Sequence, residues 1–200
     1  MVSQLETGNP FMFYRDEVNR KNPNKHAGMV YSSNLCTEIL QNMSPTRLMQ
    51  EIISGTQIVT TKQAGDFVVC NLSSINLGRA ILPQDDQGDL ITDVLERLVP
   101  IQVRMLDNVI DLNQLPVPQA TITNRKYRAI GLGTFGWHHL LARKGIHWES
   151  TEAEDFSDAL YERINFLTVQ ASMALAKEKG CYPVFAGSDW HTGAYFRDRG

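Results

Sequence analysis

Three polar side chains that can cooperate in chemistry recur at every second position of one short stretch: Asn34, Cys36 and Glu38. In an extended backbone, residues two apart project to the same face of the chain. In a helix they project to nearly opposite sides. The spacing therefore predicts an extended backbone over Asn34–Glu38 that presents an amide, a thiol and a carboxylate together, with Leu35 and Thr37 on the other face.

The pairing of a thiol with a carboxylate indicates which chemistry to expect. A negative charge beside Cys36 raises the pKa of the thiol and keeps it protonated, whereas a nucleophilic thiolate needs a lowered pKa. An intact S–H bond suits hydrogen-atom transfer instead. Glu38 can accept a proton from a substrate hydroxyl, which Asn34 can orient. The spacing alone also fits a small buried cysteine beside a helix cap at Asn34, and both interpretations stay open at this point.

The composition is that of a soluble globular protein large enough to bury a sizeable core. The chain has 200 residues, of which 42% are hydrophobic and 20% charged. A net charge of -3 gives no general reason to expect a nucleic-acid partner. No apolar run approaches the ~20 residues that span a bilayer, and the first residues lack the pattern of a signal peptide. A cytoplasmic protein without a membrane partner is predicted.

The cysteines and histidines indicate neither a disulfide framework nor a metal site. The three cysteines, Cys36, Cys70 and Cys181, are odd in number and form no C-x-x-C pair, so they are predicted to be free thiols. The five histidines show no metal-ligand spacing. No metal or cofactor is expected to be bound by this chain.

Several elements are predicted to position the cysteine stretch. The β-branched run Asp66–Leu72 is the clearest strand and places Cys70 on one face with Val68 and Leu72. Residues 52–61 could contain a short strand or be irregular. Residues 82–89 are predicted to form a surface loop. No repeat or linker divides the chain, so residues 1–200 are predicted to be a single segment with no independent domain boundary.

Helical periodicity marks three segments. The first runs from Leu90 to Ile110 and contains Pro100, which is expected to kink or break it. A second is predicted from about residue 134 to 143. The longest covers residues 152–179 after a capping box formed by Thr151 and Glu154, and it stops at Gly180. Its apolar stripe is predicted to be core and consists of Phe156, Leu160, Ile164, Leu167, Ala171 and Leu175.

A glycine motif precedes the second helix. Gly131, Gly133 and Gly136 fit the spacing G-x-G-x-x-G, which is half of a dinucleotide-binding fingerprint. The other half is missing, since no buried strand precedes it and no strand with an acidic end follows. The glycines are instead expected to let the start of the helix pack closely against a neighbour. A dinucleotide-dependent oxidoreductase stays as a minor hypothesis that rests on these glycines alone.

Several segments, in one order along the chain, resemble the catalytic subunit of ribonucleotide reductase, and together they cover essentially the whole sequence. The most specific part is the N-x-C-x-E element at Asn34–Glu38 followed by C-N-L-S-S-x-N-L at Cys70–Leu77. The other similar segments are Asn9–Asp16, Asn22–His26, Arg128–Gly133 and the stretch from Ser188 to Phe196.

The resemblance implies an α/β fold and a role for each candidate residue. The fold would be part of a ten-stranded α/β barrel with the radical cysteine on an inner loop, plus long helices. Cys36 would become a transient thiyl radical that removes the 3′ hydrogen of a ribonucleotide. Glu38 would take the 3′-hydroxyl proton, and Asn34 would hold the ribose hydroxyls. Cys70 would be one of two thiols that reduce the 2′ carbon.

The resemblance also implies partners. The radical would come from a small subunit with a di-metal centre or, as the second choice, from adenosylcobalamin. The substrate would be a ribonucleoside diphosphate, and a thioredoxin- or glutaredoxin-type reductant would act indirectly. The family's catalytic subunit is several times longer, and the thiol partner of Cys70 has no counterpart here. The chain is therefore expected to be a fragment that works only with the remaining fragments of the catalytic subunit. The alternative is an inactive remnant or an interaction module.

Overall fold

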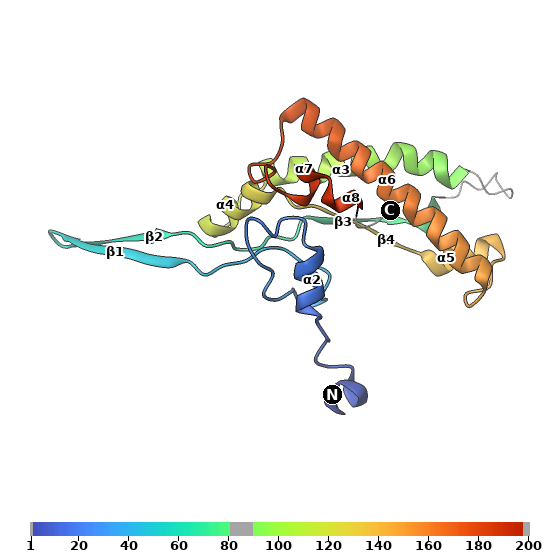
Figure 1. The fold of residues 1–200 in the computed structure, drawn as a ribbon, viewed down its shortest axis with the longest axis horizontal. Helices are drawn as coiled ribbons and strands as arrows, with labels where there is room; N and C mark the ends of the chain where they lie inside the picture. Colours follow the sequence, from blue (N-terminus) through green and yellow to red (C-terminus); the bar gives the residue numbers. More distant parts are fainter. Residues whose placement is uncertain (1, 81–89, 198–200) are drawn as a thin grey trace. The chain divides into compact units, whose positions relative to one another are not determined.

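The computed structural model describes residues 2–80 and 90–197 (Figure 1). The chain forms two compact units that alternate along the sequence. The first unit comprises Met1–Cys70, Gln114–Ala129 and Tyr182–Gly200, and the second comprises Asn71–Asn113 and Ile130–Cys181. The predicted loop at residues 82–89 lies outside the described residues.

The second unit combines two long helices with a pair of parallel strands. Helix α3 (Leu90–Leu112) packs along helix α6 (Thr151–Lys179), and strand β3 (Leu72–Asn76) pairs in parallel with strand β4 (Gly131–Phe135) (Figure 1). The short helix η1 (Leu77–Arg79) and helix α5 (Trp137–Lys144) complete the unit. Its apolar core is formed by Ile75, Leu77, Ala80, Leu95, Val99, Val103, Leu140, Leu160, Ile164, Leu167, Ala171 and Leu175.

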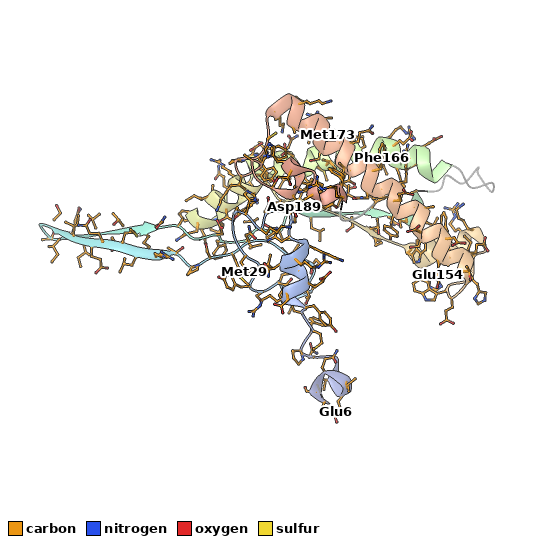
Figure 2. All side chains as sticks on the ribbon, in the orientation of Figure 1. Glu6, Met29, Glu154, Phe166, Met173 and Asp189 are labelled. Atoms are coloured by element: carbon orange, nitrogen blue, oxygen red, sulfur yellow. The ribbon has the colours of Figure 1, made fainter. Side chains whose placement is uncertain are left out.

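Helix α6 confirms the predicted apolar stripe. The stripe residues after Phe156 are all buried, and Phe156 itself packs against the core. The predicted cap is wrong by one residue, since the N-cap is Ser150, whose hydroxyl accepts a hydrogen bond from the Ala153 N–H at 3.2 Å. The helix ends at Gly180, whose φ of +91° favours glycine. On its other side, α6 leaves Phe166 and Met173 about half exposed (Figure 2).

Helix α3 runs through Pro100, so of the predicted kink or break the break is wrong, and the kink stays a prediction. Proline in a helix interior costs about 3 kcal/mol because it removes one hydrogen bond and crowds the preceding turn. Burying a single valine or leucine side chain contributes roughly 1.5–3 kcal/mol. Leu95 and Val99 before the proline and Val103 after it are all buried. Apolar packing on both sides therefore outweighs the cost of the proline.

The glycine motif lies in a strand that its sequence does not indicate. Gly131 and Gly133 belong to β4, and a β-carbon at either position would come within 2.8 Å of the side chain of Leu72 or Ser74 in β3. Close packing is therefore confirmed, but the neighbour is a strand and the packing precedes the helix. Helix α5 begins at Trp137, later than predicted, after Gly136 with a φ of +77°.

The first unit has little regular structure. Strands β1 (Arg47–Ser54) and β2 (Gln57–Gln63) form an antiparallel hairpin in which every residue is exposed, which confirms and extends the possible strand at residues 52–61. The helices of this unit are α1 (Val2–Thr7), α2 (Arg15–Lys21), α4 (Pro118–Tyr127), α7 (Asp189–Thr192) and α8 (Ala194–Arg197). The predicted strand Asp66–Leu72 is wrong for residues 66–71, because β3 begins only at Leu72.

The mixture of helices and strands agrees with the predicted α/β class. Among the described residues the strands form two separate two-stranded sheets and no closed barrel. No helix in the described ranges is both long enough and apolar enough to cross a membrane. The prediction of a single segment over residues 1–200 stays a prediction.

Candidate functional site

Cys36 lies in a tight turn, so the predicted extended backbone over Asn34–Glu38 is wrong. The Thr37 N–H donates to the Asn34 carbonyl oxygen at 3.2 Å, which closes a β-turn with Leu35 and Cys36 at its centre. Thr37 then has a φ of +68°, in the left-handed region that a β-branched residue rarely adopts. Such a backbone conformation costs energy and persists only where the surroundings hold it.

The side chain of Asn34 holds this turn. Its Nδ2 donates to Glu38 Oε1 at 2.7 Å, and its Oδ1 accepts from the Ile39 N–H at 3.1 Å. The Ser33 hydroxyl donates to the Ile39 carbonyl oxygen at 2.7 Å and closes the base of the turn. The amide and the carboxylate predicted to act together are therefore in direct contact, although a turn and not a strand brings them together.

Cys36 is exposed at the centre of the turn, and no helix begins at Asn34. The alternative of a buried cysteine beside a helix cap is therefore wrong for this structure. Cys70 and Cys181 are also exposed, and all three cysteines are free thiols, as predicted.

Cys70, the predicted reducing thiol, is close enough to Glu38 for the carboxylate charge to affect its pKa. The pKa of the Cys70 thiol is raised, first by partial loss of solvation and second by the Glu38 carboxylate. The structure thus shows a charge effect of Glu38 at Cys70, and the effect that the sequence predicts at Cys36 stays a prediction. The two segments that carry the candidate residues therefore meet within the first unit.

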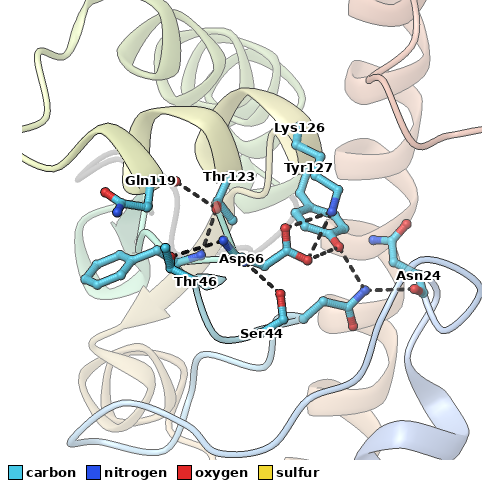
Figure 3. A network of polar contacts seen from close by, with 11 residues as sticks. Asn24, Ser44, Thr46, Asp66, Gln119, Thr123, Lys126 and Tyr127 are labelled. Carbon is cyan, nitrogen blue, oxygen red and sulfur yellow. Dashed lines mark hydrogen bonds and ion pairs between the residues drawn. The ribbon is translucent and has the colours of Figure 1, made fainter. Parts of the chain in front are cut away.

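Hydrogen bonds align the segment after the turn with the segment before Cys70. The Ser44 N–H donates to the Asp66 carbonyl oxygen at 3.1 Å, and the Asp66 N–H donates to the Ser44 hydroxyl at 2.9 Å (Figure 3). Farther along, Gln41 Nε2 donates to the Val69 carbonyl oxygen at 3.1 Å. The segments run in opposite directions, so the bond at Gln41 lies on the side nearer the two cysteines.

Helix α4 anchors this arrangement through Asp66 (Figure 3). The Asp66 carboxylate accepts hydrogen bonds from Lys126 Nζ at 2.7 Å and from the Tyr127 hydroxyl at 2.8 Å. The Phe67 N–H donates to the Thr123 hydroxyl at 2.7 Å. Burial opposes the charge of Lys126, but its hydrogen bonds to Asp66 and Tyr127 outweigh burial, and its pKa is raised. Neither α4 nor this network is apparent from the sequence.

A buried asparagine connects the N-terminal loop to the same network. Asn42 accepts a hydrogen bond from Asn22 Nδ2 at 2.7 Å, and its own amide donates to the Asn24 carbonyl oxygen at 2.8 Å and to the Tyr127 hydroxyl at 3.3 Å. Burying an amide without hydrogen-bond partners would cost about 1–3 kcal/mol. The three hydrogen bonds of the Asn42 amide offset this cost. Asparagine in a loop is too common for the sequence to reveal this role.

The C-terminal part of the first unit holds the same N-terminal loop. Lys25 Nζ pairs with an oxygen of Asp189 at 2.6 Å, and a ring nitrogen of His26 is 3.0 Å from the Val184 carbonyl oxygen. The Tyr182 hydroxyl donates to Asn24 Oδ1 at 2.7 Å. Two segments that resemble the reductase sequence, 22–26 and 188–196, are therefore in contact.

A hollow of about 490 Å³ in the first unit does not coincide with the candidate site. It is lined by Tyr31, Met43, Ser44, Pro45, Asp66, Phe67 and Val68. None of the four predicted site residues lines it. In the parts of the chain that the structure describes, no group of three or more histidines, cysteines or carboxylates is arranged to hold a metal ion.

Comparison with known proteins gives the family. The model of the ribonucleotide reductase barrel domain matches residues 1–199, and the chain belongs to this family. It is 53% identical over its whole length to the alpha subunit of ribonucleoside-diphosphate reductase from Treponema pallidum, of which it covers 23%. It is 37% identical over its whole length to the alpha subunit from Helicobacter pylori, of which it covers 29%. It is also 34% identical, over 93% of its length, to the large subunit from variola virus. The chain thus spans about a quarter of the length of these relatives.

Proposed function

We propose that this chain is part of the catalytic subunit of a ribonucleoside-diphosphate reductase and supplies its radical cysteine, its base and one of its two reducing thiols. The observation that carries the proposal is the hydrogen bond of Asn34 to Glu38 across the turn that presents Cys36, together with the effect of the Glu38 charge on Cys70. A site for hydrogen-atom transfer followed by two-electron reduction needs this combination of groups. Since the chain spans only part of its relatives, turnover belongs to the assembled subunit.

The proposed reaction begins with a thiyl radical on Cys36. This radical takes the hydrogen atom from C3′ of the ribose, so an S–H bond forms and the C3′–H bond breaks. Glu38 accepts the proton of the 3′-hydroxyl, which Asn34 helps to orient. The 2′-hydroxyl then leaves as water. Cys70 and a second thiol outside this sequence become a disulfide and supply two electrons and two protons, of which one proton enters the departing water and the other the new C2′–H bond. Cys36 finally returns the hydrogen atom to C3′, and Glu38 returns the proton to the 3′-oxygen.

The raised pKa of Cys70 supports its role as a reductant. A thiol that stays protonated at neutral pH retains the proton that the departing hydroxyl needs. The radical itself would be supplied by a small subunit with a di-metal centre or, as the second choice, by adenosylcobalamin. The disulfide would be reduced again by a thioredoxin- or glutaredoxin-type protein. The chain would work in the cytoplasm and without a membrane partner.

The test is the Cys36→Ser substitution in the assembled reductase that contains this segment. Turnover of ribonucleoside diphosphate should be abolished, because the O–H bond of serine is too strong to replace the S–H bond in hydrogen-atom transfer. The matched control is Cys181→Ser, which removes another exposed free thiol and should leave turnover unchanged. Retained turnover in Cys36→Ser would overturn the proposal. No turnover from the wild-type segment in the complete assembly would favour the inactive remnant.

A further inference from the structure

The segment that follows the cysteine turn is in register with the segment that precedes Cys70. The Ser44 N–H donates to the Asp66 carbonyl oxygen, and three residues nearer the cysteine turn the Gln41 side chain reaches the Val69 carbonyl oxygen. Cys70 directly follows Val69, and Glu38 is three residues before Gln41. These contacts set the register of the two segments and hold the segment of Cys70 beside the segment of Glu38.

A regular strand ladder does not maintain this register. Neither residues 41–44 nor residues 66–70 belong to a strand, so main-chain hydrogen bonds at regular intervals do not fix their spacing. The contact nearest to the cysteines comes from a side chain: the Gln41 amide donates to the Val69 carbonyl oxygen, directly before Cys70. Gln41 is half-buried, so this bond is partly shielded from water.

We propose that Gln41 is a positioning residue for the reducing thiol, because its amide fixes the backbone at Val69 and thereby sets the distance between Cys70 and Glu38. This inference rests on the proposed function for its catalytic consequence, but the positioning itself is a property of the structure. Loss of the Gln41 amide should let the segment 69–70 move away from Glu38. A displacement of about 1 Å can reduce an enzymatic rate by up to roughly a hundredfold.

The test uses Gln41→Met in the assembled reductase, since methionine has a similar length and no N–H donor. The kcat should fall roughly ten- to a hundredfold with KM within about twofold, because substrate contacts are not altered. The second measurement is the rate of iodoacetamide alkylation at Cys70 as a function of pH, read from the Cys70 peptide by mass spectrometry. Its midpoint should move to lower pH, because a thiol farther from the Glu38 carboxylate loses part of what raises its pKa. Because burial also raises this pKa, the shift is assigned to Glu38 only if it disappears when Gln41→Met is combined with Glu38→Gln.

The matched control is Gln57→Met on the exposed hairpin, which should change neither measurement. Gln41→Lys keeps an N–H donor on a long side chain and should recover part of the lost kcat. A Cys70 alkylation profile that is unchanged in Gln41→Met would overturn the positioning role, even if Cys36→Ser abolishes turnover. A shifted profile combined with full turnover in Cys36→Ser would support the positioning role while the proposed function fails.

Discussion

The two units of this chain are stabilised in different ways. The second unit is built from long helices and paired strands around an apolar core, in which Leu77, Leu95 and Leu140 are fully buried. The first unit has a backbone that is irregular around the cysteines and is fixed by individual polar contacts, such as those of Asn34, Asn42 and Asp66.

The two units are stabilised differently because the first unit presents the candidate site residues and the second does not. Regular helices and strands satisfy their own backbone and can be stabilised by non-directional apolar burial. A turn that presents a thiol beside a carboxylate cannot use a ladder of main-chain bonds, so side-chain donors and acceptors replace it. Single substitutions should therefore act by different mechanisms in the two units, and four experiments test this, from the largest expected effect to the smallest.

In the second unit, Leu140→Ala should have the largest effect on stability. Removing a fully buried leucine side chain costs about 2–5 kcal/mol, through lost burial and the cavity that is left. Hydrogen exchange of the α3 and α6 amides in the complete subunit would measure this as reduced protection. Leu112→Ala, at an exposed position on α3, is the control and should have little effect. Equal effects of the two substitutions would show that apolar burial does not hold this unit.

In the first unit, Asp66→Asn should be next in size. The substitution removes the charge that Lys126 pairs with and weakens the bond from Tyr127, at a cost of about 2 kcal/mol for a partly buried pair. Hydrogen exchange should show lost protection in α4 and unchanged protection in α6. Asp155→Asn at an exposed position of α6 is the control. Loss of protection in both units after Asp66→Asn would contradict their independent stabilisation.

At the start of α6, a polar contact caps a helix of the unit that is otherwise organised around an apolar core. Ser150→Ala removes the N-cap and should cost about 1 kcal/mol, seen as faster exchange in the first turn of the helix. Ser157→Ala, inside the same helix, should be neutral or slightly stabilising because alanine is the better helix former. If both serine substitutions had the same sign, Ser150 would not act as a cap.

The smallest effect concerns Glu17 of α2, whose pKa is lowered to about 2 by hydrogen bonds from Arg20 and Lys21. Because the pKa is lower in the folded state, its contribution to stability is present above the ordinary value of 4.5 and is lost as the pH falls toward 2. The Glu17 carboxyl is fully exposed, so we expect the lowered pKa to be seen only in its own titration, followed by NMR of the side-chain carboxyl. Arg20→Met should raise the midpoint, and an unchanged midpoint would exclude the ion pair.

The sequence predicts the elements whose signal is local. The stripe from Leu160 to Leu175 is visible as helical periodicity, and Gly180 marks the end of the helix. The four candidate site residues can also be proposed from the sequence, because their types define the chemistry whatever the backbone conformation, and they stay a prediction. Strand β4 was missed because its glycines have no strand preference and it exists only through pairing with β3, far away in the sequence.

The turn at Cys36 and the segment before Cys70 show a second limit. Alternate spacing at Asn34–Glu38 predicts a strand, but the Asn34 side chain bonds Ile39 and Glu38 and folds the backbone into a turn. The β-branched run at residues 66–70 also predicts a strand, but its partners are side chains of Ser44, Gln41 and Thr123. Contacts between distant segments decide which side chains take the place of main-chain strand hydrogen bonds. Such contacts leave no periodic pattern in the sequence.

The alternation of the two units along the chain has a practical consequence for dissecting the protein. The chain passes from one unit to the other after Cys70, Asn113, Ala129 and Cys181. No single cut can therefore release either unit intact, and a truncation after Asn113 or Ala129 removes pieces of both. A nick at any of the four crossings would leave at least one unit assembled from two peptides, so limited proteolysis should yield fragments that stay associated until they are denatured.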